Sequence, residues 1–147
     1  MANSDDTQTL HGTALVVGAK GVLLLGESGS GKSTLAHALI AHARAERYFA
    51  RWVADDQMHV RRAGDAVMVH AARNIAGKAE HRFHGIVDVL HVPSARIDLV
   101  VHLKDETELD RMPERKTDRS FPEIDTLAVP RRSTTISVPL ILSQLNI

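Results

Sequence analysis

A glycine-rich octapeptide, Gly26 to Ser33, constrains this chain more than any other feature of its sequence. It reads Gly-Glu-Ser-Gly-Ser-Gly-Lys-Ser and matches the pattern G-x-x-x-x-G-K-[ST] in full. An apolar run at 22–25 precedes it, and a segment with helical spacing of apolar residues, 32–47, follows it. Glycine adopts backbone conformations that residues with a Cβ rarely adopt, so successive N–H groups can surround phosphate oxygens. The motif therefore predicts a strand, a phosphate-binding loop and a helix, in that order.

We predict that this loop binds a nucleoside triphosphate. The positive end of the helix that follows attracts phosphate. Lys32 can reach the outer phosphates, and the Ser33 hydroxyl can ligate a bridging Mg²⁺. A glycine-rich turn without a chemical role is the alternative, and the Lys-Ser pair at the helix start argues against it. The predicted nucleotide-binding residues are Gly26, Glu27, Ser28, Gly29, Ser30, Gly31, Lys32, Ser33 and Thr34.

Two adjacent carboxylates, Asp55 and Asp56, follow the apolar run 49–54. The pattern predicts a strand that ends at this pair, after the first helix. At a strand end one carboxylate can face the metal and the other an incoming hydroxyl. Neighbouring acids also raise one another's proton affinity, which suits a general base. A solvated turn after a buried strand is the alternative for this pair.

The remaining sequence predicts a single domain over residues 1–147, with a flexible leader at 1–9. Alternating or apolar runs predict hairpins from 13–17 with 22–25 and from 58–60 with 67–69, and further strands at 86–90 and 97–101. The charged stretch 104–119 predicts a loop with a short helical turn. The last segment, 134–142, is predicted to be β-like around Pro139.

Composition excludes several classes of protein. Eighteen Lys and Arg balance eighteen Asp and Glu, so no net charge favours nucleic acid or an anionic membrane. The chain has no cysteine, which excludes disulfide scaffolds and Cys-ligated metals. Its longest apolar stretch is too short to span a bilayer, and the polar first residues show no signal peptide, so we expect a cytoplasmic protein. The nine histidines lack the spacing of a helical zinc site.

Taken together and in order, the motifs resemble the catalytic domain of bacterial HPr kinase/phosphorylase, in the short form without the family's N-terminal domain. The resemblance covers residues 11 to about 146. It includes Leu10-His11-Gly12, the phosphate loop, Val53-Ala54-Asp55-Asp56, the segment Glu80-His81-Arg82-Phe83-His84-Gly85-Ile86-Val87 as a variant of the family's E-x-R-G-x-G-I-[IV] signature, and Asp110-Arg111.

This resemblance implies an α/β fold, a P-loop domain of the phosphoenolpyruvate-carboxykinase/HPr-kinase kind with a mixed β-sheet. It implies a kinase that uses ATP and Mg²⁺ to phosphorylate a serine of HPr, a phosphocarrier of the sugar phosphotransferase system, and that commonly assembles as a hexamer. By position, Ser33 and Glu80 match the magnesium ligands. The implied catalytic residues are Asp56 as the proton acceptor with Asp55 beside it, His11, Lys32, Arg82 and the late arginine Arg111.

Departures from the family pattern keep two other functions open. Phe83 and His81 change the signature loop, which leaves a nucleotide-responsive module that binds the carrier without catalysis. A small-molecule kinase is the other alternative, with Arg111, Arg115 and Arg119 in a phosphate-covering lid. Residues 137–142 stand where the family carries the basic loop P-V-R-P-G-R, so we expect weak phosphorylase activity unless Arg131 and Arg132 replace that loop.

Overall fold

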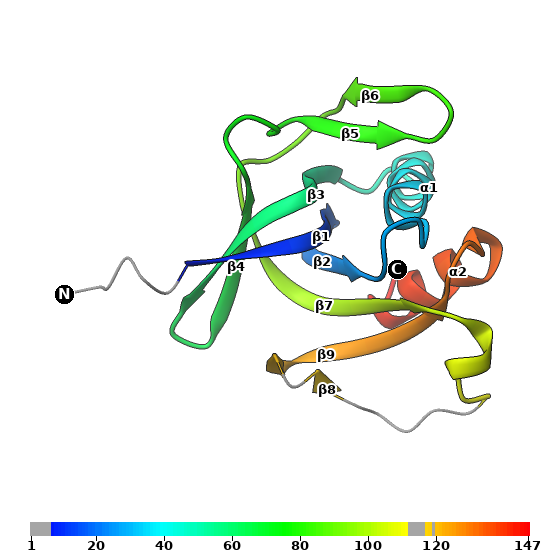
Figure 1. Ribbon diagram of the computed structural model, residues 1–147. Coiled ribbons are helices and arrows are strands. Elements are labelled where there is room, and N and C mark those ends of the chain that lie inside the picture. The colour runs from blue at the N-terminus through cyan, green and yellow to red at the C-terminus, as the bar shows by residue number, and fades with distance from the viewer. Residues whose placement is uncertain (1–6, 112–116, 119) are drawn as a thin grey trace.

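The computed structural model describes residues 7–111, 117–118 and 120–147 (Figure 1). Two α-helices and one 3₁₀ turn accompany nine strands in this part of the chain. The elements in chain order are β1 (Thr7–Val17), β2 (Lys20–Leu25), α1 (Lys32–Ala45), β3 (Ala50–Ala63), β4 (Ala66–Ala71), β5 (Lys78–His81), β6 (Gly85–Asp88), β7 (Ala95–Lys104), η2 (Glu106–Glu108), β8 (Thr117–Asp118), β9 (Phe121–Pro130) and α2 (Thr134–Gln144).

The main sheet has seven strands in the order β2-β1-β3-β4-β7-β9-β8, and β2 also pairs with β7. That extra pairing closes five strands into a ring. Strands β2 and β9 run parallel to β7, whereas the β1–β2, β1–β3, β3–β4 and β4–β7 pairs are antiparallel. The expected mixed α/β sheet is therefore confirmed.

The ring closes tightly at Gly21, where β2 meets β7. A Cβ at Gly21 would lie 1.9 Å from the carbonyl oxygen of Arg96. Only a residue without a side chain allows that approach of the two strands. Strand β2, which leads into the phosphate loop, is consequently paired along both edges.

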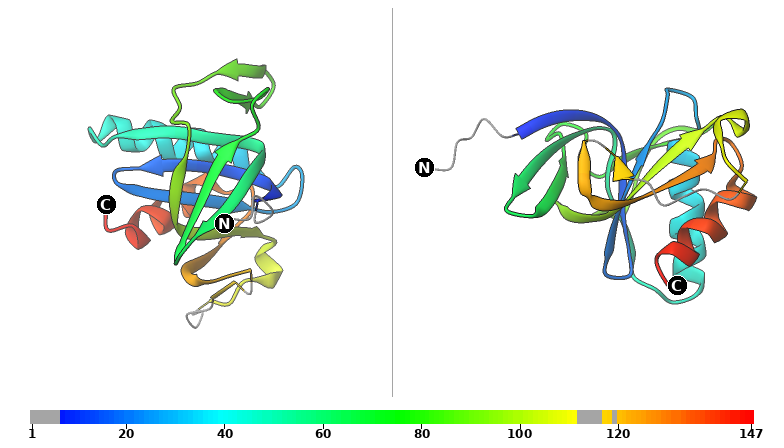
Figure 2. Two further views of the ribbon diagram at one scale, coloured as in Figure 1. Left: turned by 90° about the vertical axis from the view of Figure 1, so that its left-hand side faces the viewer. Right: turned by 90° about the horizontal axis from the view of Figure 1, so that it is seen from below.

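Two hydrophobic cores lie on opposite faces of the sheet. One lies between the sheet and the two helices and includes Leu15, Leu39 and Ile141. The other fills the space enclosed by the strands and includes Leu23, Met58 and Val100. Figure 2 shows α1 and α2 side by side at one end of the molecule, while β1, β3 and β4 extend toward the other end. The loop between β2 and α1 is thus supported by packed apolar side chains on both sides.

The first helix and the two predicted hairpins are confirmed. Strands β1 and β2 pair through a turn at Gly18, and β3 and β4 pair through a turn at Gly64, where φ is +62° and +60°. In α1 the buried residues recur at helical spacing on one face: Leu35, Ala36, Leu39, Ile40 and Ala43. This apolar face is what fixes the helix against the sheet.

The strand that carries the acidic pair does not end there, which corrects the sequence prediction. Strand β3 continues through Asp55 and Asp56 to Ala63. The register with β1 shifts by one residue at Val53, and Asp56 has φ +74°. This local irregularity releases the pair from the strict alternation of a regular strand while the pairing continues beyond it.

The last segment is a helix, so the β-like reading of 134–142 is wrong. Its buried residues, Val138, Ile141, Leu142 and Leu145, recur three and four apart and pack in the core that α1 also joins. Pro139 lies inside this helix but is exposed, so water can satisfy the carbonyl group that loses its backbone donor. Burial of the apolar face outweighs the break that proline introduces.

The segment 78–88 forms a two-stranded sheet of its own, β5–β6, rather than adding a strand to the main sheet. Strand β1 begins at Thr7 and pairs with β3, so residues 7–9 are strand and not part of a flexible leader. The expected helical turn in 104–119 is η2, and residues 112–116 and 119 lie outside the described part. No helix among the described residues is long and apolar enough to cross a membrane.

Candidate active site

The phosphate loop connects the end of β2 to the first turn of α1, as the motif predicts. Gly29 and Gly31 have φ of +79° and +95°, and Gly31 is the N-cap of α1. The Ser30 N–H donates to the Glu27 carbonyl oxygen at 3.0 Å, which closes the loop on itself. These positive φ angles are why the loop needs glycine at both positions.

Lys32 folds back over the loop that precedes it. Its Nζ donates to the carbonyl oxygens of Gly26 at 2.8 Å and Glu27 at 3.0 Å. Burial lowers the pKa of Lys32 from its ordinary value, while the negative charges of Asp55 and Asp56 act in the opposite direction. The ammonium group therefore lies within electrostatic reach of both carboxylates, and it is available to exchange carbonyl partners for phosphate oxygens.

Asp55 is the centre of the polar network. It is 6% exposed, and three groups donate to its carboxylate: the hydroxyls of Thr13 and Ser33 and the backbone N–H of Glu80. Thr13 Oγ1 and Ser33 Oγ both lie 2.8 Å from Oδ1, and the Glu80 nitrogen lies 2.8 Å from Oδ2. The buried carboxylate thus joins β1, α1 and the β5–β6 hairpin at one point.

Asp56 differs sharply from its neighbour. Its side chain is exposed and, among the described residues, has no hydrogen bond or ion pair. The positive φ of Asp56 is a strained conformation for a residue with a Cβ, although Asp tolerates it better than most. The strand register places Asp56 opposite Gly12 and Gln57 opposite His11. The sequence-predicted His11 therefore lies on the strand directly beside the acidic pair, with its side chain exposed.

The β5–β6 hairpin brings Glu80 to the site through its backbone. The Glu80 N–H binds Asp55, and its carbonyl oxygen accepts a hydrogen bond from Nε2 of His37 at 3.0 Å. The Glu80 side chain is exposed. The side chains of Ser33, Asp55 and Glu80 carry only oxygen atoms as possible metal ligands, and Mg²⁺ prefers oxygen ligands.

No group of three His, Cys, Asp or Glu side chains that could hold a metal occurs within the described residues. A magnesium ion in a nucleotide site does not need one, since it keeps several waters and takes its other ligands from phosphates. The Ser33 hydroxyl and the Asp55 carboxylate, 2.8 Å apart, are oxygen ligands of the kind that such an ion takes.

Two arginines from the β9–α2 connection reach the phosphate loop. Arg132 Nε donates to the Gly29 carbonyl oxygen at 2.9 Å, and its backbone N–H donates to that of Ser30 at 3.2 Å. Arg131 pairs with Asp105 at 2.8 Å and lies 3.9 Å from a Glu27 carboxylate oxygen. The sequence named these arginines only as possible replacements for a missing basic loop.

Their position corrects the placement of that loop. Residues 137–142, which we matched to it, lie inside α2. The connection that precedes the helix is the segment beside the phosphate loop, and nothing in the apolar periodicity of the sequence indicates that contact.

The other predicted arginines have different surroundings. Arg82, at the tip of the hairpin, lies over the Phe83 ring, with its guanidinium carbon 4.9 Å from the ring centroid. It lines a cavity with Gly31 and Thr34. Arg111 is exposed and has no hydrogen bond or ion pair with another described residue. Arg115 and Arg119 lie outside the described residues.

Comparisons with known proteins agree on one family. Residues 3–140 match the family model described as HPr Serine kinase C-terminal domain. The chain is 30% identical over 146 residues to the HPr kinase/phosphorylase of Levilactobacillus brevis, covering 92% of this chain and 43% of that protein. It is 37% identical over 105 residues to the protein of the same name from Lactobacillus delbrueckii subsp. bulgaricus, covering 71% of this chain and 30% of the relative. The chain thus spans less than half the length of these curated relatives.

A solved structure has the same fold. The Hpr(Ser) kinase/phosphatase from Coxiella burnetii superposes with a TM-score of 0.76 at 22% sequence identity. The match covers 95% of this chain and 94% of that chain. The fold of this chain is therefore one already seen in a solved structure.

Proposed function

Because the chain belongs to the family of HPr Serine kinase C-terminal domains, we propose that it transfers the γ-phosphoryl group of ATP to a serine of HPr or an HPr-like phosphocarrier. The single observation that supports this best is the contrast between its two adjacent acids. Asp55 is buried and accepts three kinds of donor, whereas Asp56 is exposed and unpaired among the described residues. One carboxylate is thus held in place, and the other is free to accept a proton.

In the proposed step, Asp56 accepts the proton of the serine hydroxyl as its oxygen attacks the γ-phosphorus. The new serine oxygen–phosphorus bond forms while the bond from the γ-phosphorus to the bridging oxygen breaks, and ADP leaves with that oxygen. Lys32 stabilises the charge on the transferring group, and the Arg132 guanidinium, already at the loop, neutralises charge beside it. His11 lies beside the acidic pair, where it can contact the incoming serine segment.

The proposed cofactors are ATP and Mg²⁺. The metal would be held by Ser33 and Glu80, and Asp55 fixes both residues by accepting the Ser33 hydroxyl and the Glu80 N–H. When bound, Mg²⁺ supplies charge neutralisation across the outer phosphates. We further propose a homo-oligomeric protein of the cytoplasm, with neither nucleic acid nor membrane as a partner.

The reverse reaction depends on cationic donors near the phosphate loop. In phosphorolysis, inorganic phosphate attacks phosphoserine and releases pyrophosphate. Weak activity was expected because the basic loop is missing from residues 137–142. Arg131 and Arg132 lie at the phosphate loop and supply donors of the required charge.

The deciding experiment is transfer of label from [γ-³²P]ATP to purified HPr, followed by phosphoamino-acid analysis. Labelled phosphoserine on HPr is the expected result. A labelled small acceptor in place of HPr would support a small-molecule kinase. Nucleotide binding without transfer to any acceptor would support the carrier-binding module. Either of these two results would overturn the proposed protein kinase activity.

A further inference from the structure

A cavity of about 300 Å³ opens beside the phosphate loop, between the first turns of the two helices. Gly31, Thr34 and Leu35 line it from α1, and Ser133 and Thr134 line it from the start of α2. Figure 1 shows the β5–β6 hairpin and α2 on opposite sides of α1. We call this space the interhelical cavity. Its volume lies at the lower end of the range that holds small organic ligands.

The position of the cavity relative to the carboxylates indicates how a bound nucleotide is oriented in the site. Ser33, Asp55 and Asp56 mark the reacting end of a bound nucleotide, and none of them lines the cavity. Gly31 and Thr34 belong both to the loop and to the cavity wall. A nucleotide whose outer phosphates lie at Lys32 therefore has its other end directed toward this cavity.

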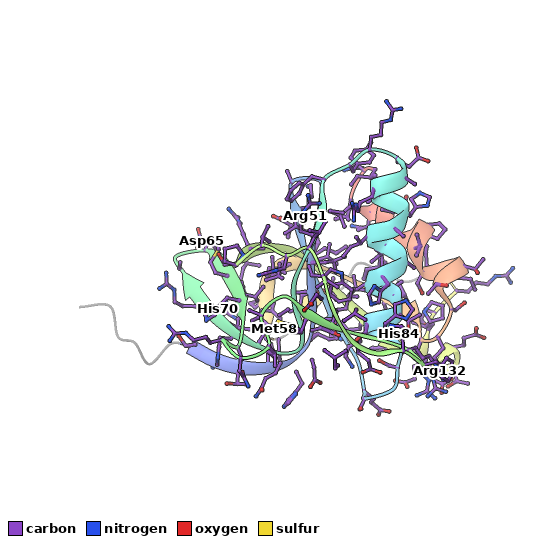
Figure 3. All side chains as sticks on the ribbon, turned by 90° about the horizontal axis from the view of Figure 1, so that it is seen from above. Arg51, Met58, Asp65, His70, His84 and Arg132 are labelled. Carbon is purple, nitrogen blue, oxygen red and sulfur yellow. The ribbon has the colours of Figure 1, made fainter. Side chains whose placement is uncertain are left out.

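The walls match a flat, weakly polar group. Leu35, Leu103 and Pro130 are the apolar residues of the lining, and Arg82 and Arg132 are its charged residues. Guanidinium planes stack well on aromatic bases. Figure 3 shows His84 of the hairpin tip and Arg132 at the same end of the molecule, near the start of α1, and Arg82 lines the same cavity as Arg132.

One face of the Arg82 guanidinium already lies against Phe83, which is 96% exposed and has φ +64°. A bulky residue in this conformation is strained, and its side chain gains no burial in exchange. The contact with the Phe83 ring holds the Arg82 guanidinium in a fixed orientation, which is the role we assign to this conformation. Because Arg82 also lines the cavity, an aromatic base bound there can contact it.

We propose that the interhelical cavity is the nucleoside subsite, in which Arg82 stacks on the base and the start of α2 contacts the sugar or base edge. This inference rests on the proposed use of a nucleotide by the loop. It moves Arg82 from the reacting end of the site to the base end. The apolar residues Leu35, Leu103 and Pro130 in the lining favour a nucleoside over a separate anion.

The test compares ADP with pyrophosphate by titration calorimetry in the presence of Mg²⁺, because only ADP carries a nucleoside. Thr134→Phe inserts a ring into the cavity, and Thr135→Phe makes the same change at the next, exposed helix position, which does not line it. We expect Thr134→Phe to weaken ADP binding by roughly tenfold or more, which is the scale of losing a stacked base. The affinity for pyrophosphate should change by less than about twofold. Thr135→Phe should change neither.

Retained pyrophosphate binding also shows that each variant has folded its loop. Equal weakening of both ligands by Thr134→Phe, or no weakening of ADP, would overturn the nucleoside subsite while leaving the phosphate loop in place. If the unmodified protein bound neither ligand, the nucleotide function itself would fail, and the subsite with it.

Arg82 provides an independent measurement. Arg82→Lys keeps the positive charge but removes the planar guanidinium group. If Arg82 acts by stacking, this variant should weaken ADP binding about as much as Arg82→Ala does. Full rescue of ADP affinity by lysine would show that Arg82 acts as a charge and would contradict its role in stacking.

Discussion

The hydroxyl of Ser33 donates to both oxygens of the Asp55 carboxylate, at 2.8 and 2.9 Å. Ser33 belongs to the first turn of α1 and Asp55 to β3, so this contact fixes the phosphate loop against the centre of the sheet. Because the same carboxylate holds Thr13 and the Glu80 N–H, the geometry of the loop and of the hairpin depends on one buried charge.

Asp56→Asn tests the general base. Asparagine adopts positive φ as readily as aspartate, so the backbone at φ +74° is preserved. We expect turnover to fall by roughly 10²- to 10⁴-fold, with ATP affinity nearly unchanged, in a steady-state assay of HPr phosphorylation. Asp55→Asn is the comparison, and we expect it to lower the free energy of unfolding by about 1–3 kcal/mol because it disrupts a buried hydrogen-bonded carboxylate. Loss of turnover in Asp55→Asn alone would reverse the two assignments.

Lys32→Ala removes the cation that covers the outer phosphates. We expect turnover to fall by roughly 10²- to 10³-fold, the usual effect of deleting one preorganised charge at a transferring group. Lys20→Ala, at an exposed lysine that begins β2, is the matched control and should leave turnover unchanged. Equal activity of the two variants would refute the assignment of the phosphate loop.

Glu80→Gln tests the proposed metal ligand without altering the backbone N–H that binds Asp55. A neutral amide is a poorer ligand for a hard cation, so the Mg²⁺ concentration that gives half-maximal activity should rise. The measurement is a magnesium titration at saturating ATP. An unchanged magnesium requirement would mean that the exposed Glu80 side chain is directed away from the metal.

Replacing Arg131 and Arg132 together with alanine tests the reverse reaction. We expect release of pyrophosphate from phosphoserine-HPr and inorganic phosphate to be lost to a greater extent than the forward reaction. Arg47→Ala, an exposed arginine after α1, is the control. Negligible phosphorolysis by the unmodified protein would instead support the original expectation of a weak phosphorylase.

His70 gives the protein a dependence of stability on pH. Burial lowers its pKa below the ordinary value of 6.5, and the positive charges of His59 and Arg61 lower it further. As pH falls below 6.5, the unfolded chain binds a proton more readily than the folded protein, so stability decreases. Between neutral pH and pH about 5, the free energy of unfolding should fall less in His70→Gln than in the unmodified protein. Urea unfolding at each pH measures this difference. Identical pH profiles would contradict this role.

Much of the site was predictable because its chemistry is local in sequence. The loop from Gly26 to Ser33 specifies its own backbone through glycine and its ligand through Lys32 and Ser33. The acidic pair was also recognised, and the structure brings Asp55 onto Ser33. The strand end predicted there was wrong, because a one-residue register shift and a positive φ give the same freedom inside a continuous strand.

The parts that could not be predicted depend on tertiary contacts. Residues 134–144 contain Pro139 and β-branched residues, which favour strand locally, but burial of Ile141 and its helical neighbours decides for helix. Strand β9 was missed because its alternation is interrupted, and it forms by pairing in parallel with β7. The contact of Arg132 with Gly29 joins residues more than a hundred positions apart, and no local pattern encodes it.

Closure of the sheet at β2 and β7 also limits where the protein can move. With hydrogen-bonded neighbours on both edges, β2 has no free side along which it can slide or fray, and Gly21 leaves no room for a shift against Arg96. Rearrangement on ligand binding therefore has to take place downstream of Leu25, in the loop itself and in the hairpin and α2 connection that flank it. The barrel acts as a fixed frame, and the elements that meet the substrate are attached outside it.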